Sequence, residues 1–105
     1  MSLNDRGHDH EGRYAHDEER KFRIEARATK LLGLWAAGKL GKTGTDGEAY
    51  AAQLVNLDLG AAGPQDVFAR IRADFDAAGV QQSDHQIERH RTECLEEAEK
   101  QVAAS

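Results

Sequence analysis

Aromatic and other hydrophobic residues are scarce in this chain of 105 residues: 6% are aromatic, 39% are hydrophobic and 31% are charged. The chain can therefore bury only one modest core, and we expect a single folded domain. No stretch approaches the run of about 18 apolar residues that spans a bilayer, so no direct membrane insertion is expected. β-branched residues are few and alanine is frequent, which favours helices over strands.

Cations are outnumbered as well, since 14 lysine and arginine residues face 19 aspartate and glutamate residues, for a net charge of -5. This balance argues against duplex nucleic acid and anionic membrane surfaces, which both bind clustered cations. The only cysteine, Cys94, cannot form an internal disulfide, which suits a reducing compartment. We therefore expect a cytoplasmic protein whose partner is another protein and not a nucleic acid.

A first helix is expected from near Tyr14 to Gly41, because acid and base residues lie four apart at its start and apolar residues then recur with helical spacing. Gly33 lies inside this helix, where glycine costs about 1 kcal/mol relative to alanine. Close approach by a neighbouring helix is the compensation we expect there. Residues 2–13 hold two glycines and almost no apolar side chain, so we expect this segment to be disordered in the free protein.

The second helix is expected to start at Thr45-Asp46-Gly47-Glu48, which matches a capping box, and to end near Leu59. Tyr50 and Leu57 are expected at the boundary of its buried face. The glycine-rich segment 60–64 then interrupts the chain before a third helix.

Pro64 suits the first position of the third helix, and Gly79 suits its left-handed end. Ser83-Asp84-His85-Gln86 is a second capping box and predicts the start of a fourth helix. Four amphipathic helices with short connections predict an all-α fold, a four-helix bundle with a flexible N-terminal arm. The expected buried stripes, helix by helix, are Ile24, Ala28, Leu31, Leu32 and Trp35; Ala51, Leu54, Val55 and Leu59; Val67, Phe68, Ile71 and Phe75; and Ile87, Cys94, Leu95, Ala98 and Val102.

The turn after the first helix, Gly41-Lys42-Thr43, resembles the end of a phosphate-binding P-loop. It does not fit that pattern, because the first glycine would fall at Ala36 and the context runs from helix to loop. The residues also allow a weaker anion site, in which Lys39 and Lys42 hold a phosphate beside the backbone amides of the turn. A solvated helix end is the alternative.

No enzyme and no metal site are predicted. Cys94 has no histidine placed beside it by the sequence, and its position in an inward stripe is typical of a small core residue. The carboxylates alternate with bases on helix faces, which indicates a solvated surface. The N-terminal histidines have no tetrahedral Cys/His spacing to define a metal site: these are His8, His10 and His16, beside Asp5, Asp9, Glu11 and Asp17.

Several motifs resemble the zeta-subunit family of alphaproteobacterial F-type ATP synthases. The resemblance is dense from Asp5 to Gly44 and continues loosely to the C-terminus. It implies a non-catalytic regulatory subunit with an arm over residues 1–16 and a four-helix bundle over residues 17–105, located at the inner membrane through the synthase. The motifs are Tyr14-Ala15-His16-Asp17-Glu18-Glu19, Phe22-Arg23-Ile24-Glu25-Ala26-Arg27, Leu31-Leu32-Gly33-Leu34-Trp35-Ala36-Ala37 and Leu40-Gly41-Lys42-Thr43-Gly44.

The resemblance also implies a mechanism. The N-terminal arm would insert at a catalytic interface between the α and β subunits, with γ as a further candidate partner, and block ATP hydrolysis. The arm residues implied by the match are Asp5, Arg6, Glu11, Arg13, Tyr14, Ala15, His16 and Asp17.

The family is further associated with ADP or ATP binding on the bundle, although no cofactor is required. Transferred to this chain, that property implies a nucleotide site at Trp35, Lys39, Lys42 and Thr43. The arm departs from the family pattern by carrying Gly7, His8, His10 and Gly12 in place of helix-forming and apolar residues. A small nucleotide-sensing module with weak or no inhibitory action is therefore the alternative, and a plain helical adaptor is a third.

Overall fold

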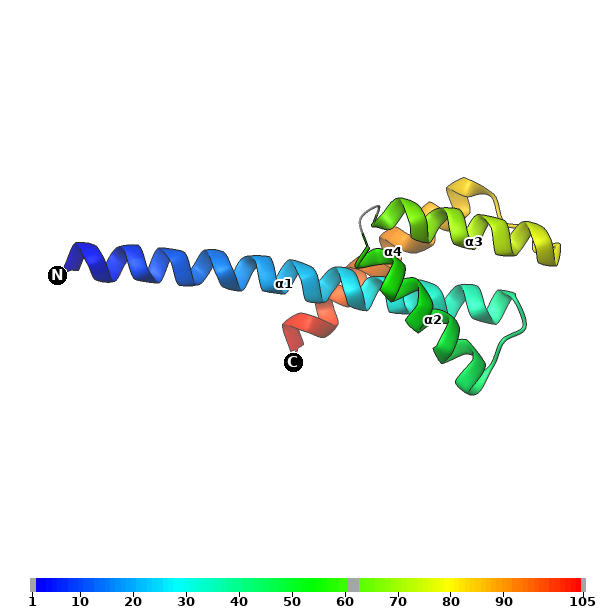
Figure 1. Ribbon diagram of the computed structural model, residues 1–105, viewed down its shortest axis with the longest axis horizontal. Helices are drawn as coiled ribbons and strands as arrows, with labels where there is room; N and C mark the ends of the chain where they lie inside the picture. Colours follow the sequence, from blue (N-terminus) through cyan, green and yellow to red (C-terminus); the bar gives the residue numbers. More distant parts are fainter. Residues whose placement is uncertain (1, 61–62, 105) are drawn as a thin grey trace.

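The structure, a computed structural model, describes the backbone of residues 2–60 and 63–104 and the side chains of residues 18–60 and 63–103. It contains four helices: α1 (Ser2–Lys39), α2 (Gly44–Asp58), α3 (Pro64–Ala78) and α4 (Asp84–Ala104). No strand occurs in the described part of the chain. Helix α1 packs against α2 and α4, and α2 packs against α3 (Figure 1). The predicted all-α fold with four helices is confirmed.

The core lies where the four helices meet, and every helix contributes to it. Its largest fully buried side chains are Leu32 from α1, Leu54 from α2, Ile71 and Phe75 from α3, and Ile87 from α4. All five belong to the stripes predicted from helical spacing. Burial of such side chains stabilises the fold by about 1.5–3 kcal/mol each, so these few contacts account for much of the hydrophobic stabilisation.

Two residues of the second helix differ from the prediction. Leu59, expected to face inward, is 52% exposed, because α2 ends at Asp58 and Leu59 is its C-cap. Tyr50, expected at the boundary, is only 4% exposed. Its hydroxyl can be buried because it donates a hydrogen bond of 2.8 Å to the Asp74 carboxylate of α3.

The contact between α1 and α2 depends on Gly33. A Cβ atom at this position would lie 2.8 Å from the Cα of Ala51 and 3.2 Å from Cδ1 of Leu54. Ala51 is itself fully buried against the glycine face of α1. The predicted close approach at Gly33 is therefore confirmed, and the partner is α2.

The prediction of a capping box at residues 45–48 was wrong. Helix α2 begins at Gly44, and its N-cap is Thr43, which has extended backbone angles (φ -129°, ψ 162°) and no side-chain cap bond. The Thr43 carbonyl accepts from the Asp46 amide at 3.2 Å, which starts the helix. Thr45 already lies inside the first turn, because the connection from α1 is short: Lys42 N bonds back to Ala37 O at 2.8 Å.

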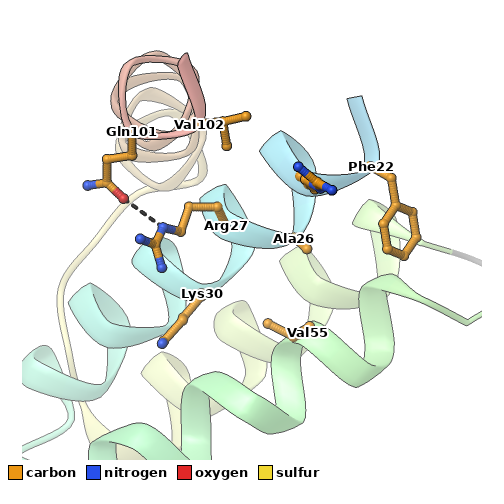
Figure 2. A pocket seen from close by; sticks show the side chains of 8 residues that line it. Phe22, Ala26, Arg27, Lys30, Val55, Gln101 and Val102 are labelled. Atoms are coloured by element: carbon orange, nitrogen blue, oxygen red, sulfur yellow. Dashed lines mark hydrogen bonds between the residues drawn. The ribbon is translucent and has the colours of Figure 1, made fainter. Parts of the chain in front are cut away.

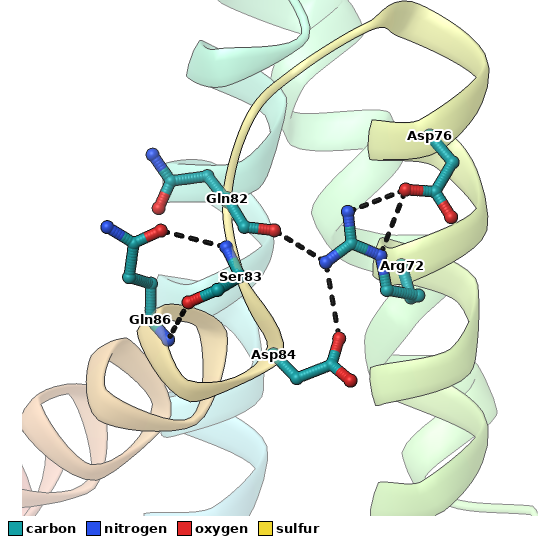
Figure 3. Close-up of polar contacts among 6 residues, drawn as sticks. All are labelled: Arg72, Asp76, Gln82, Ser83, Asp84 and Gln86. Atoms are coloured by element: carbon teal, nitrogen blue, oxygen red, sulfur yellow. Dashed lines mark hydrogen bonds and ion pairs between the residues drawn. The ribbon is translucent and has the colours of Figure 1, made fainter.

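The boundaries of α3 and α4 follow the predicted chemistry. Pro64 occupies the start of α3, and Gly79 ends it in the left-handed region with φ 72°. The second capping box is formed: the Gln86 amide donates to Ser83 Oγ at 3.1 Å, and the Ser83 amide donates to Gln86 Oε1 at 2.8 Å (Figure 3).

Hydrogen bonds from Arg72 link α3 to the start of α4. Its guanidinium donates to Asp76 Oδ1 at 2.6 Å, one turn further along α3, and to Asp84 Oδ1 at 3.2 Å in the first turn of α4. It also donates to the carbonyl of Gln82 in the connecting loop (Figure 3). One side chain therefore links three consecutive parts of the chain and holds the loop in place.

Candidate functional site

The predicted inhibitory arm forms the N-terminal part of α1, which projects away from the other helices (Figure 1). Helix α1 continues without a break from Ser2, upstream of the predicted start near Tyr14. The side chains of the arm lie outside the described residues, so their roles and the boundary at residue 17 stay predictions. The predicted arm residues are Asp5, Arg6, Glu11, Arg13, Tyr14, Ala15, His16 and Asp17.

The described side chains just after the arm show where α1 leaves the bundle. Residues 18–23 are all exposed, and partial burial begins at Ile24. The ion pair in this stretch, Arg23 with Glu19 at 3.8 Å, lies between side chains that are 64% and 60% exposed. Such a pair contributes little, so this part of α1 depends mainly on its own backbone hydrogen bonds. Helix α1 therefore packs against the bundle from about Ile24 onward.

Trp35, one of the predicted nucleotide-binding residues, is packed at the edge of the core. Its indole meets the ring of Phe75 edge-on, with centroids 5.6 Å apart, and stacks on the imidazole of His90 with centroids 4.0 Å apart. These contacts join α1 to α3 and α4. The imidazole of His90 covers one face of the indole, and the two ring contacts give Trp35 a packing role.

The other predicted nucleotide-binding residues surround the turn between α1 and α2. Lys39, Lys42 and Thr43 are all exposed. Among the four predicted nucleotide-binding residues, only Lys42 contributes to the lining of a cleft of about 590 Å³ between this turn, α2 and α3. The structure thus separates Trp35, Lys39 and Thr43 from the cleft to which Lys42 contributes.

Tyr50 forms the floor of this cleft beneath two cations. The Lys42 ammonium lies 6.0 Å from the centre of the Tyr50 ring, and the Arg70 guanidinium lies 5.7 Å from it. The cleft is also lined by Gln53 and Asp74. The two cations give the cleft a positive charge that suits an anion.

Hydrogen bonds hold this arrangement together. Arg70 Nε donates to Asp74 Oδ2 at 2.8 Å, the oxygen that also accepts from Tyr50, and Arg70 Nη2 donates to Gln53 Oε1 at 3.0 Å. Burial and the neighbouring Asp74 carboxylate raise the pKa of Tyr50, so the phenol stays protonated at neutral pH. The i, i+4 spacing of Arg70 and Asp74 is visible in the sequence, but their meeting with α2 requires the tertiary fold.

A comparison with models of known protein families shows to which family this chain, with its extended helix on a helical bundle, belongs. The family model described as ATPase inhibitor subunit zeta matches residues 1–101. The chain belongs to this family. The resemblance inferred from the motifs is thereby confirmed, and the family description implies a regulatory protein that inhibits an ATPase and interacts with the ATP synthase. None of the curated proteins compared matches the chain significantly.

The zeta-family chain carries a single thiol, and its surroundings make it a poor nucleophile. Cys94 is half-buried, and burial together with the neighbouring Glu93 raises its pKa. Within residues 18–60 and 63–103, no group of three or more His, Cys, Asp or Glu side chains could hold a metal ion. The side chains of His8, His10 and His16 lie outside that range. None of the described helices is long and apolar enough to cross a membrane.

Proposed function

We propose that this zeta-family protein inhibits ATP hydrolysis by inserting the arm, residues 1–16, at a catalytic interface between the α and β subunits of the ATP synthase. The observation that carries the proposal is the projection of α1: the helix is exposed over residues 18–23 and packs against the bundle only from Ile24. The bundle would stay outside the catalytic head and present the arm to it. The protein would then lie at the inner membrane through the synthase.

An inserted helix can block catalysis without any chemistry of its own, because hydrolysis requires the catalytic interfaces to change shape. A segment that holds one interface in a single conformation prevents this change and stops hydrolysis. Gly7 and Gly12 oppose this action, since each costs about 1 kcal/mol relative to alanine when the arm is held as a helix. Together they would weaken binding of the arm by about 30-fold.

Deleting residues 1–16 is expected to abolish inhibition, because the inserting segment is lost while the described core is retained. The measurement is ATP hydrolysis by the cognate ATPase at increasing concentrations of full-length or truncated protein. Replacing both Gly7 and Gly12 by alanine should act in the opposite direction and lower the half-inhibitory concentration by at least about tenfold. Circular dichroism and thermal melting verify that the truncated bundle is folded. Unchanged hydrolysis with the full-length protein would refute the proposal.

A second function, binding of ADP or ATP, is favoured by the cleft beside Lys42. Its volume of about 590 Å³ is within the range of small-molecule sites, and Lys42 and Arg70 place two cations at it, over the buried ring of Tyr50. We propose that the phosphates lie toward Lys42, because Arg70 is already hydrogen-bonded to Asp74. The aspartates at the cleft, Asp46 and Asp74, would repel phosphate and keep the affinity low.

Lys42→Ala should weaken nucleotide binding by about tenfold, because a cation facing the phosphates is removed. Lys39→Ala is the matched control: Lys39 is an exposed lysine at the same turn that does not line the cleft. Titration of isotope-labelled protein with ADP and ATP, followed by NMR, measures both affinities and maps the site. Equal losses for the two variants, or shifts confined to residues away from Tyr50 and Arg70, would remove the cleft as the site.

A further inference from the structure

A second hollow of the molecule lies at the base of the projecting part of α1, between α1, α2 and the end of α4 (Figure 2). This groove has a volume of about 440 Å³. Phe22, a large apolar side chain, stands at its edge with 58% of its surface exposed. The lining residues are Phe22, Arg23, Ala26, Arg27, Lys30, Val55, Gln101 and Val102.

The charges around this groove are one-sided. Three cations line it, Arg23, Arg27 and Lys30, and none of the described lining residues is a carboxylate. Two acids contact residues of the lining: Glu19 pairs with Arg23 at 3.8 Å, and Glu97 accepts from Gln101 at 3.2 Å. On a chain with a net charge of -5, a cationic groove with an apolar floor is a local reversal of the overall surface.

We propose that this groove docks an acidic amphipathic helix of the target ATPase. The apolar ridge of that helix would lie against Phe22, Ala26 and Val55, and its carboxylates would face the cations. A helix is the element that fits, because grooves between helices bind amphipathic helices through apolar anchors, and no strand edge occurs in the described residues. Charge complementarity selects an acidic partner.

The position of the groove favours the target ATPase over a second copy of this chain. It lies on α1 just where that helix leaves the bundle, so a protein that receives the arm is brought next to Phe22 and Lys30. This inference therefore rests on the proposed inhibitory function. Docking at the groove would hold the arm at high effective concentration near its interface.

The test uses full-length variants in pairs. Phe22→Ser removes the exposed apolar anchor, and Leu59→Ser is its control, since Leu59 is 52% exposed at the end of α2. Lys30→Glu reverses a cation of the groove, and Arg89→Glu is its control, since the Arg89 side chain is 76% exposed on α4. Each groove variant is expected to raise the half-inhibitory concentration for ATP hydrolysis by about tenfold, and each control by less than about twofold.

The outcomes separate this inference from the function on which it rests. If the unmodified protein inhibits and both groove variants inhibit equally well, the docking proposal is overturned and the inhibitory function stands. If the unmodified protein does not inhibit, the proposed function itself fails. Sedimentation gives the remaining contrary result: a dimer that Phe22→Ser dissociates, with inhibition unchanged, would assign the groove to a second copy. Thermal melting of each variant verifies that these surface changes leave the fold intact.

Discussion

Phe75→Ala is expected to lower the free energy of unfolding by about 3–5 kcal/mol. The ring is fully buried in α3, and its neighbour Trp35 meets it edge-on at 5.6 Å. Truncation removes the transfer free energy of the ring, the aromatic contact and the close packing around both. A domain of this size is stable by only about 5–15 kcal/mol, so this one change removes a large share of the total.

Urea unfolding, followed by circular dichroism and by the fluorescence of the single tryptophan, measures this loss. The two other phenylalanines provide a graded control. Phe68 is half-buried at the edge of the core, and Phe22 is 58% exposed, so the losses should decrease in the order Phe75, Phe68, Phe22. If Phe75→Ala costs no more than Phe22→Ala, the core is not where this structure places it.

The elements that depend on local chemistry could be predicted from the sequence. Pro64, Gly79 and the Ser83–Gln86 box act on backbone groups at most four positions away, and each has its predicted role in the structure. The centres of the buried stripes were predictable for the same reason, because helical spacing places their residues on one face whatever the helix packs against. Other members of the predicted stripes are only half-buried: Ile24, Leu31, Val55, Leu95 and Val102. Trp35, Phe68 and Cys94 lie at the edge of the core, which helical spacing cannot distinguish from its centre.

The start of α2 shows where this reasoning fails. Thr43 and Thr45 are both acceptable cap residues, and only Thr45 has a glutamate three positions later. The choice is made by the end of α1, because the bond from Lys42 to Ala37 leaves so short a connection that α2 begins at Gly44. Local sequence patterns rank the caps, but the geometry of the turn decides between them.

The candidate sites were less predictable than the fold, because they are built from separate helices. Lys42 was recognised as a cation beside a turn, whereas its neighbours Tyr50 and Arg70 come from α2 and α3. The groove at Phe22 likewise joins α1 to Val55 of α2 and to the end of α4. Which faces of these helices meet is a property of the packed bundle, and no single amphipathic pattern specifies it.

Gly33→Ala is expected to destabilise the bundle by about 1–3 kcal/mol, although alanine is the better helix former. The added methyl group would lie 2.8 Å from the Cα of Ala51, so the backbones of α1 and α2 must separate. Backbone atoms cannot move aside as the end of a flexible side chain can. The steric cost therefore exceeds the gain of about 1 kcal/mol in helix propensity.

Gly38→Ala is the matched control in the same helix. A Cβ atom at this position meets nothing within 4 Å, so the substitution should stabilise the protein by up to about 1 kcal/mol. Urea unfolding of the two variants therefore gives shifts of opposite sign if α1 and α2 touch at Gly33. Stabilisation by both alanines would contradict the close approach, and with it the packing by which α2 holds the helix that carries the arm.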